Sequence, residues 1–476
     1  MKFIIAGLAL CLSANLLALA NELPDLGDAS QSAMSPAQEQ RLGDGIMAQI
    51  RSANGYLDDP EIADYLNTLG YRLVAASPDP GGAYEFFAVS DGAVNAFALP
   101  GGYIGVHSGL LLTTQAEGEL ASVLAHEIAH VSQRHLARML AVQQRAGLAS
   151  MAAIAVAILA ARSNSQASMA AIAAAQAGTI QAQLNFSREH EREADRVGLQ
   201  ILEKAGFDVH AMPVFFERMQ RAARAYGNGA PSYLLTHPLT YERIADIQSR
   251  IQNLPFRPAP DSLEFGMVKA RVAVLDGNAI DVAANMQAAL VDRKFASETA
   301  LRYGYVLALL RARQPARARE QLGLLLALGK KSPMIDALAA QTLIAAGDFQ
   351  GGISAYQTAL RIHPGRRALV YGYAEALIAG NRATEAIEFL ASRTDRRAAD
   401  ARLYELEAQA YAGLGKRMLQ HRALAEAQAL KGNLPAAIEQ LQIAEKSKDG
   451  DFYQKSSVEA RKKELMGLDL ENRQKP

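Results

Sequence analysis

The sequence predicts a mainly α-helical protein: an N-terminal α+β domain with a small β-sheet, followed by an all-α solenoid of helical repeats. Apolar residues recur at helical intervals between Leu120 and Val131, which favours a long amphipathic helix. Two short β-prone runs, 86–89 and 103–106, are separated by Pro-Gly-Gly at 100–102, where a turn is expected. Beyond residue 265, similar helix ends recur about every 34 residues, a period typical of stacked helical repeats.

The first twenty residues predict a secretory signal peptide. Lys2 precedes an apolar run over 3–12, and the Ala-Leu-Ala ending favours cleavage after Ala20. Cys11 is the only cysteine, and Leu10 before it argues against a lipoprotein cleavage site. We therefore expect an exported mature chain that contains no cysteine.

Length and composition predict at least two folded domains. The 476 residues are 50% hydrophobic and 21% charged, which are ordinary values for a soluble globular protein. Without residues 1–20 the chain carries 48 basic and 49 acidic residues, a net charge of −1. Because the sequence contains no dense basic tract, nucleic acid is excluded as an expected partner.

The run His-Glu-Ile-Ala-His at 126–130 contains two candidate metal ligands and a candidate general base. Positions i and i+4 share a helix face, so His126 and His130 can both bind one Zn²⁺ at ~2.0–2.1 Å. Glu127 then lies beside the metal-bound water, where a carboxylate can act as general base and pass the proton to the leaving amine. Capping-box spacing over 114–117 supports a helix and argues against a chance match. The motif thus predicts a zincin-type metallopeptidase domain.

A third metal ligand is expected downstream, because catalytic zinc sites use three protein ligands and keep the fourth position for water or substrate. The metzincin pattern would require Gly and His where this chain has Gln133 and Leu136. The better candidate is the charged stretch 187–195, which precedes an apolar helical run. Glu191 and Asp195 share one face there, and Asp195 can accept the outer N–H of a ligand imidazole. A solvated charged helix is the alternative.

These two motifs together resemble the gluzincin-type metallopeptidases that include HtpX and the CAAX prenyl proteases. The resemblance rests on His-Glu-x-x-His followed by Ser-Arg-x-x-Glu-x-x-Ala-Asp and on the strand-like segment 95–104, and it covers roughly residues 40–250. It implies one Zn²⁺ per chain, with Glu191 as third ligand rather than Glu189 or Glu193. The β-prone runs form an ordinary hairpin, offer a strand edge where an extended substrate binds by β-addition, or do both.

His237 is a further histidine that we expect to reach the active site. Pro238 biases it toward an extended loop conformation, and Thr-His-Pro resembles an element of relatives of this family. His237 either hydrogen-bonds the developing oxyanion or occupies the fourth zinc position and keeps the enzyme latent. A loop histidine with neither role is the alternative. His190 competes as a ligand, but on a helix it points about 100° away from its neighbour Glu191.

Two uncharged Ala-rich runs, 146–161 and 167–177, lie between the two ligand segments. The first, of sixteen residues, falls short of the ~20 that cross a bilayer, so a buried helical hairpin is favoured. A lid, or a surface in peripheral contact with the membrane while substrate enters, is the alternative.

The remaining sequence predicts a linker and a repeat domain. Three prolines between residues 253 and 260 interrupt helix and favour extended backbone. Gly347 and Gly380 follow similar helices 33 residues apart, with Arg313 and Gly415 in comparable positions, which resembles about four tetratricopeptide repeats. A generic α-helical domain is the alternative. The expected organisation is a signal peptide 1–20, a zinc metallopeptidase domain 21–252, a Pro-rich linker 253–264 and a repeat domain 265–470.

A signal peptide, a gluzincin-like domain and helical repeats in this order resemble the BepA-type family of periplasmic metalloproteases and chaperones of Gram-negative envelopes. The resemblance implies a zinc-dependent endopeptidase and chaperone in the periplasm, which assists assembly of outer-membrane β-barrel proteins and degrades misfolded ones. Implied partners are unfolded or stalled outer-membrane proteins and, through the repeats, the barrel-assembly and lipopolysaccharide-transport machinery.

Two alternatives are weaker. A non-proteolytic repeat scaffold or holdase with a structural zinc would not need Glu127. An inner-membrane protease of the HtpX kind, anchored through residues 146–177, would be expected to contain further long apolar spans, which this sequence lacks.

Overall fold

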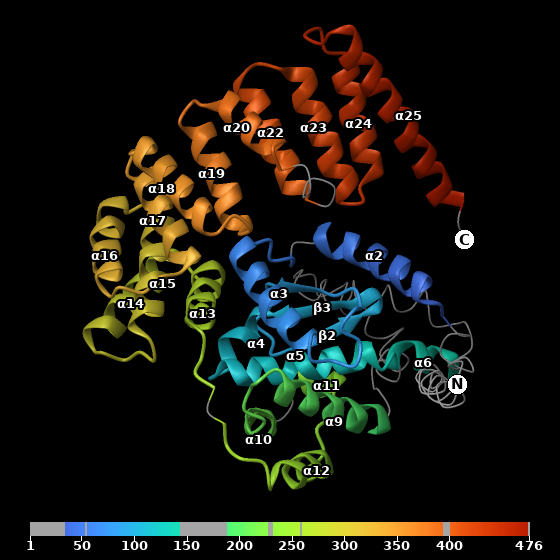
Figure 1. The fold of residues 1–476 in the computed structure, drawn as a ribbon, viewed down its shortest axis with the longest axis vertical. Coiled ribbons are helices and arrows are strands. Elements are labelled where there is room, and N and C mark those ends of the chain that lie inside the picture. The colour runs from blue at the N-terminus through green and yellow to red at the C-terminus, as the bar shows by residue number, and fades with distance from the viewer. Residues whose placement is uncertain are drawn as a thin grey trace, which may run out of the picture.

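The computed structural model describes residues 34–52, 55–142, 188–226, 232–257, 259–393 and 400–474. Within these residues the chain forms one three-stranded sheet among helices, followed by a long run of helix pairs (Figure 1). This architecture confirms the predicted fold class, mainly α with a small sheet in the N-terminal part and an all-α solenoid after it. The predicted signal peptide 1–20 and the Ala-rich segment 146–177 lie outside the described residues.

The sheet has the strand order β1-β3-β2, with β1 (Glu85–Val89), β2 (Ala96–Leu99) and β3 (Tyr103–His107). β1 pairs with β3 in parallel, whereas β2 pairs with β3 antiparallel. The Pro-Gly-Gly turn η1 (Pro100–Gly102) therefore joins β2 to β3, and its two glycines adopt φ angles of 75° and 80°, which suit a residue without a side chain. A hairpin between the first and third strands, one alternative from the sequence, is wrong because β2 takes the antiparallel place beside β3.

Alternate strand residues face two cores, because successive side chains of a strand point to opposite faces. Phe87 and Phe97 pack with α2 on one face, whereas Phe86 and Ile104 join the larger core that contains α3 and α5.

None of the described helices combines the length and apolar character needed to cross a bilayer. The helices of the N-terminal part are α2 (Pro36–Ser52), α3 (Pro60–Val74), α4 (Ser108–Thr113), α5 (Glu117–Ser132), α6 (His135–Val142), α9 (Arg188–Lys204), α10 (Ala211–Tyr226), α11 (Tyr233–Thr236) and α12 (Tyr241–Ile251).

The N-terminus of α5 is capped by a residue from far along the chain. Asp261 accepts a hydrogen bond of 2.7 Å from the backbone N–H of Glu117, the first residue of α5. The carboxylate of Glu117 in turn accepts hydrogen bonds from the backbone N–H and the hydroxyl of Ser262. The predicted capping box over 114–117 is wrong, because Thr114 instead forms the C-cap of α4. The segment that leads into the repeats is thereby tied to the start of α5.

Six successive helix pairs form the solenoid within the described residues. The first helices of these pairs begin 35, 35, 34, 34 and 33 residues apart, the period of tetratricopeptide repeats. The pairs are α13 (Leu263–Asp276) with α14 (Ala279–Val291), α15 (Glu298–Arg311) with α16 (Pro315–Ala327), α17 (Pro333–Ala345) with α18 (Phe349–Ile362), α19 (Arg367–Ala379) with α20 (Ala383–Ala391), α22 (Ala401–Gly413) with α23 (Arg417–Leu430), and α24 (Leu434–Glu445) with α25 (Phe452–Gln474).

A left-handed residue marks the turn inside four of these pairs. Arg313, Gly347, Asn381 and Gly415 have φ between 57° and 86°, and they follow one another at intervals of 34 residues. The landmark expected at Gly380 lies one residue too early, because an asparagine rather than a glycine takes the left-handed position there. The expected number of about four repeats is too low, since the first and last pairs lack this landmark.

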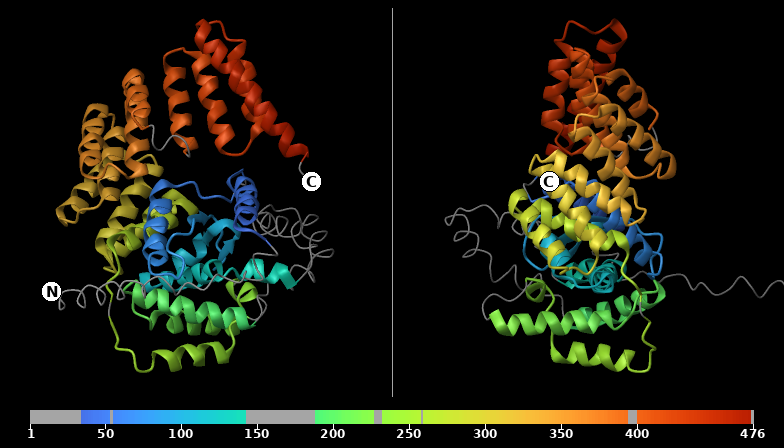
Figure 2. Two further views of the ribbon diagram at one scale, coloured as in Figure 1. Left: turned by 45° about the vertical axis from the view of Figure 1, so that its right-hand side comes forward. Right: turned by 90° about the vertical axis from the view of Figure 1, so that its left-hand side faces the viewer.

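The solenoid curves over the N-terminal part (Figures 1 and 2). Two ion pairs connect it to α3. Arg271 on α13 forms a buried bidentate pair with Asp59, the N-cap of α3, at 2.8 Å for both N–O distances. Arg367 on α19 bonds Asp64 on α3 at 2.7 Å. Because α3 also packs against α5, the solenoid is connected to α5 through this helix as well as through Asp261.

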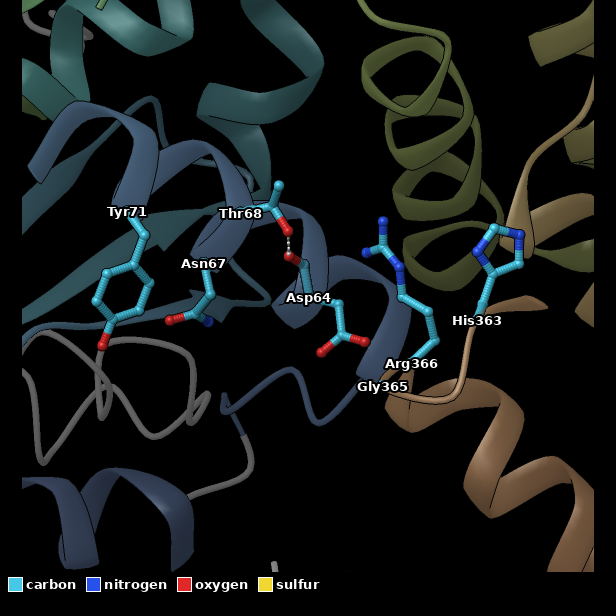
Figure 3. A pocket seen from close by; sticks show the side chains of 7 residues that line it. All are labelled: Asp64, Asn67, Thr68, Tyr71, His363, Gly365 and Arg366. Atoms are coloured by element: carbon cyan, nitrogen blue, oxygen red, sulfur yellow. Dashed lines mark hydrogen bonds between the residues drawn. The ribbon is translucent and has the colours of Figure 1, made fainter. Parts of the chain in front are cut away.

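A cavity of about 410 Å³ lies between α3 and the turn that joins α18 to α19. Figure 3 shows the side chains of α3 that line it opposite the residues of the turn. The solenoid thus leaves a cavity beside α3 at this turn, whereas α13 and α15 share a continuous apolar core with α3. The lining residues are Asp64, Asn67, Thr68 and Tyr71 on α3, and His363, Gly365 and Arg366 on the turn.

Glu61 lies close to this interface, and its buried carboxyl predicts a pH effect on stability. Burial raises the pKa of Glu61 from 4.5 to about 7, although Arg271 acts in the opposite direction. Between these two values the folded chain binds more protons than the unfolded chain, so stability falls as pH rises. Glu61→Gln is therefore expected to raise the free energy of unfolding at about pH 8 by on the order of 2 kcal/mol, and to change it little near pH 4.5. Thermal unfolding of both proteins at the two pH values measures this, and an equal shift at both would contradict it.

Candidate metal centre

The two predicted ligand segments lie on adjacent helices. α5 carries the His-Glu-x-x-His motif, and α9 carries Glu191 and Asp195 on its buried face. Ala194 between them is fully buried. Gly198, one turn further along α9, lies so close to α5 that an added Cβ would be 3.1 Å from the backbone nitrogen of His126. Small residues on α9 thus allow the two ligand helices to touch.

Four side chains bring their ligand atoms together in the interior. Atoms of His126, His130, Glu191 and His237 all lie within 4.8 Å of one another, and all four residues are buried. The Nε2 atoms of His126 and His130 are 3.0 Å apart. Oε2 of Glu191 lies 3.5 Å from Nε2 of His126, and Oε1 of Glu191 lies 3.5 Å from Nε2 of His130. Nδ1 of His237 lies 3.4 Å from Nε2 of His126 and 3.1 Å from Oε1 of Glu191.

These distances fit a tetrahedral metal site. Ligand atoms at ~2.0–2.1 Å from a tetrahedral Zn²⁺ are separated from one another by roughly 3.3–3.4 Å. Five separations between donor atoms of the cluster lie between 3.0 and 3.5 Å and bracket that value, while the whole set lies within 4.8 Å. Imidazole nitrogens and a carboxylate oxygen are also donors that Zn²⁺ accepts. The cluster therefore has both the geometry and the donor set of a metal site.

The charges around the cluster also suit a cation. Nδ1 of His126 lies 3.1 Å from Oδ1 of Asp195. Burial lowers the pKa of His126, but Asp195 and Glu191 outweigh this effect and raise it to about 9. The carboxylates thus favour a positive charge at this position, whether it is a proton or a metal ion. Burial lowers the pKa of His130 well below its ordinary value, so this ring stays neutral and keeps a lone pair for a metal.

Glu127 lies beside the cluster. Among the described residues its Oε1 accepts no hydrogen bond, and this atom lies 3.4 Å from Nε2 of His237. Burial raises the pKa of Glu127, whereas His237, His126 and a hydrogen bond from the backbone of Ala98 act in the opposite direction. A carboxyl with a raised pKa next to a metal site can accept a proton and return it at neutral pH.

A short helix brings His237 into the cluster. α11 ends at Thr236 with His237 as its C-cap, and the backbone N–H of Tyr233 at its start donates to the carbonyl of Val94, just before β2. The Tyr233 ring stacks on the His237 ring with 4.8 Å between centroids. The structure thus places His237 beside His126, His130 and Glu191.

Two further histidines lie next to the cluster. Nδ1 of His135 is 2.8 Å from Nδ1 of His130, and the His190 ring stacks on His135 with 4.6 Å between centroids. His190 is not one of the four clustered residues, in agreement with the expectation that it points away from Glu191. His135 reaches His130 because Arg134 adopts a φ of 51° and turns the chain after α5.

Arg243 is the charged residue of the site that sequence reasoning missed. Its Nε and Nη2 bond the two oxygens of Asp195 at 2.7 Å, and its Nη1 lies 2.8 Å from Glu191. Burial raises the pKa of Asp195, but Arg243 outweighs burial and lowers it. Sequence patterns do not separate Arg243 from exposed arginines such as Arg250 on the same helix, since both lie in a polar, charged stretch.

Gly198→Val is expected to push α9 away from α5 and to weaken metal binding. Even a Cβ would lie 3.1–3.2 Å from backbone atoms of α5, and backbone cannot rotate aside. Displacing Glu191 should lower metal retention by about tenfold or more. Gly45→Val on α2 is the matched control, because a Cβ there meets nothing within 4 Å. Equal losses in both variants, or none in Gly198→Val, would contradict this expectation.

Comparisons with known proteins agree with this geometry. Residues 60–251 match the model of Peptidase family M48, and residues 343–410 match a tetratricopeptide repeat model. The chain is 45% identical over 251 residues to the putative beta-barrel assembly-enhancing protease of Vibrio cholerae, an alignment that covers 53% of this chain and 52% of that protein. It is 34% identical over 452 residues to the beta-barrel assembly-enhancing protease of Escherichia coli strain K12, covering 94% of this chain and 92% of that protein.

A second similarity covers less than half of this chain. The mitochondrial metalloendopeptidase OMA1 of Schizosaccharomyces pombe is 34% identical over 216 residues, which cover 44% of this chain and 60% of that protein. The alignment with the E. coli protein, by contrast, extends over nearly the whole of both chains. The resemblance inferred from the sequence is thereby confirmed: this chain belongs to peptidase family M48, as a metalloendopeptidase that also carries tetratricopeptide repeats.

Proposed function

We propose that the chain is a zinc-dependent endopeptidase that holds one Zn²⁺ through His126, His130 and Glu191. The buried cluster that these residues form with His237 is the observation that carries the proposal. Zn²⁺ bound there would polarise the scissile carbonyl and lower the pKa of a water molecule to ~7. The separations between the donor atoms and the negative potential around them support this choice of ligands.

Glu127 is the proposed general base. Its carboxyl is fully buried beside the cluster, and its raised pKa suits a group that takes a proton from water and delivers it to the leaving amine. Asp195 is proposed to accept the Nδ1–H of His126, which lies 3.1 Å away, and so to direct Nε2 of that ring toward the metal. The two carboxylates thus have separate tasks, one in proton transfer and one in positioning.

His237 is proposed to occupy the fourth position and keep the enzyme latent. Its Nδ1 lies 3.4 Å from Nε2 of His126 and 3.1 Å from Oε1 of Glu191. These distances are no longer than the 3.5 Å between His126 and Glu191, which supports a ligand role for His237. Its Nε2 lies 3.4 Å from Glu127, so the same ring also crowds the proposed base. A substrate carbonyl would therefore need the segment after α11 to move. The oxyanion role is the second possibility, and it would require His237 to donate to the substrate rather than to contact Glu191.

β2 is the proposed edge at which an extended substrate adds as a strand. Within the described sheet β2 pairs only with β3, and the backbone of Ala98 in β2 hydrogen-bonds Glu127. The edge of β1 is covered instead, because the Asn67 amide pairs with both the N–H and the carbonyl of Phe86. A peptide along β2 would run beside α5 and present its backbone to the cluster.

The proposed substrates are unfolded or stalled outer-membrane β-barrel proteins in the periplasm. The names of the V. cholerae and E. coli relatives support this choice, together with the predicted signal peptide 1–20. The repeats in 265–470 would hold barrel-assembly and lipopolysaccharide-transport proteins and would carry the chaperone activity, since stacked helix pairs offer extended surfaces for protein partners. The division into a peptidase domain 21–252 and a linker 253–264 is part of this proposal.

A non-proteolytic scaffold with a structural zinc is the second candidate function. A closed set of four protein ligands is typical of structural zinc sites, and the cluster offers four. Glu127 favours the enzyme, because a structural site has no use for a buried carboxyl with a raised pKa beside it.

Cleavage of an unfolded outer-membrane β-barrel protein by the zinc-loaded mature chain tests the proposal. The same substrate folded in detergent micelles is the comparison, and both reactions are repeated with the chelator phenanthroline. We expect cleavage of the unfolded form only, and none with the chelator. No cleavage by the wild type and none by His237→Ala, with zinc bound to both, would favour the scaffold.

A further inference from the structure

Arg243 connects the candidate metal ligands to the segment that follows His237. It projects from the first turn of α12, where Thr240 caps its backbone N–H, and its side chain is only 3% exposed. The guanidinium bonds both oxygens of Asp195 at 2.7 Å through Nε and Nη2. Its Nη1 lies 2.8 Å from Oε2 of Glu191 and 2.9 Å from the carbonyl oxygen of Pro238. One buried side chain therefore holds α9 and the chain after α11 at the same time.

The charges of the site explain why a cation is needed at this position. Glu127, Glu191 and Asp195 are three buried carboxyls, and the last two lie one turn apart on α9. The guanidinium of Arg243 offsets one negative charge, and a divalent metal would offset two. Without Arg243, the adjacent carboxylates of α9 would repel each other and move apart, which would draw Glu191 away from the imidazole nitrogens.

The contact with Pro238 extends this effect to His237. Pro238 follows His237 directly, so a hydrogen bond to its carbonyl fixes the backbone that carries the imidazole. His237 in turn lies 3.1 Å from Glu191. Nη1 of Arg243 contacts both Glu191 and the carbonyl of Pro238. A shift of either residue would therefore break a bond to this nitrogen.

We propose that Arg243 is a positioning residue that holds Glu191 and residues 237–238 in a fixed relative position. Metal retention and the placement of the His237 imidazole at the cluster then both depend on this one side chain. This inference rests on the proposed function of the cluster as a metal site. Lysine is not an adequate substitute, because a single ammonium group lacks the planar fork that bonds both oxygens of Asp195 while also reaching Glu191 and Pro238.

Zinc affinity, measured by competition with a chelating dye, tests the positioning role without any need for proteolysis. Arg243→Met is expected to weaken zinc binding by about 10–100-fold, and Arg243→Lys by an intermediate factor. Arg196→Met is the matched control, because Arg196 joins the same two helices through Asp246 at 3.3 Å but is 46% exposed. This control is expected to bind zinc like the wild type. Circular dichroism checks folding, and if Arg243→Met does not fold, Arg243→Lys decides the test.

A double-mutant cycle with His237→Ala tests the coupling between the ligand and the segment. If Arg243 acts partly by holding His237 in place, the loss of zinc affinity caused by Arg243→Lys is smaller when His237 is already alanine. The visible spectrum of Co²⁺-loaded Arg243→Lys is expected to shift in the direction seen for His237→Ala, because both lose the same ligand. Additive losses of affinity together with an unshifted spectrum would overturn the coupling.

The outcomes separate this inference from the function on which it rests. Equal zinc affinity in the wild type, Arg243→Lys and Arg243→Met would overturn the role of Arg243 and leave the endopeptidase proposal intact. A folded wild-type chain that binds no zinc would overturn the metal site itself, and the inference with it.

Discussion

Glu127→Gln is expected to reduce casein cleavage by at least about 100-fold, because a general acid–base group contributes roughly 10²–10⁴-fold to the rate. Glutamine keeps the size of the side chain but cannot take a proton from water at neutral pH. Zinc content is expected to stay at the wild-type level, since Glu127 is not among the four clustered residues. Cleavage of labelled casein and metal analysis on the same preparations measure both quantities.

Glu189→Gln is the matched control for this variant. Glu189 belongs to the same charged motif as Glu191 but is exposed on α9, so its loss should change neither zinc content nor cleavage. A Glu127→Gln protein that holds zinc and cleaves casein at the wild-type rate would show that another group transfers the proton. Loss of zinc together with cleavage would instead assign Glu127 to metal binding.

His237→Ala is expected to raise casein cleavage, by roughly tenfold if displacing the imidazole costs about 1.4 kcal/mol in the wild type. The ring has to leave the cluster before a substrate carbonyl can approach, and its removal also frees Oε1 of Glu127, which lies 3.4 Å from Nε2 of His237. Initial rates at saturating substrate, with zinc content matched between the two proteins, measure the effect.

The same measurement distinguishes the roles open to His237. Slower cleavage at equal zinc content would contradict latency and support an oxyanion role. Unchanged cleavage would show that the contacts with Glu191 and Glu127 have no part in the reaction. His210→Ala is the control, because His210 is only partly buried and pairs with Asp208 at 2.7 Å, away from the cluster.

The parts of the site that follow from local sequence were predictable. His126 and His130 share a helix face by spacing alone, and the charged motif that contains Glu191 follows from its pattern and its resemblance to a family. His237 was singled out because Pro238 biases its backbone toward an extended conformation and because Thr-His-Pro resembles an element of relatives of the family. In each case the information lies within a few residues of the chain.

The parts that depend on contacts between distant segments were not predictable. Arg243 reaches Glu191 across 52 positions of sequence, and Asp261 caps α5 from 144 positions away. Neither pairing produces a local sequence pattern, because a buried, paired arginine or aspartate in a polar stretch has the same neighbours as an exposed one. The left-handed backbone at Arg134, which brings His135 to His130, also has no signature, since arginine is not a residue that favours this conformation.

The repeats show the same division between local and distant information. Their period was predictable because each turn reuses similar residues, such as the glycines at 347 and 415. The first pair was missed because its turn is built differently, and its helix α13 also packs against α3 and α4 of the N-terminal part. A terminal repeat that serves as an interface is under different packing constraints from the internal ones.

Reconstitution of a chelator-stripped preparation with zinc tests the central claim, that one buried cluster holds one Zn²⁺ and performs the hydrolysis. Bound zinc and casein cleavage are measured on the same samples of the wild type and of Glu191→Gln. We predict that wild-type cleavage rises in proportion to bound zinc and saturates at one zinc per chain, while Glu191→Gln retains little zinc and cleaves little. Cleavage that persists without zinc, or a Glu191→Gln protein that binds and cleaves like the wild type, would contradict the account.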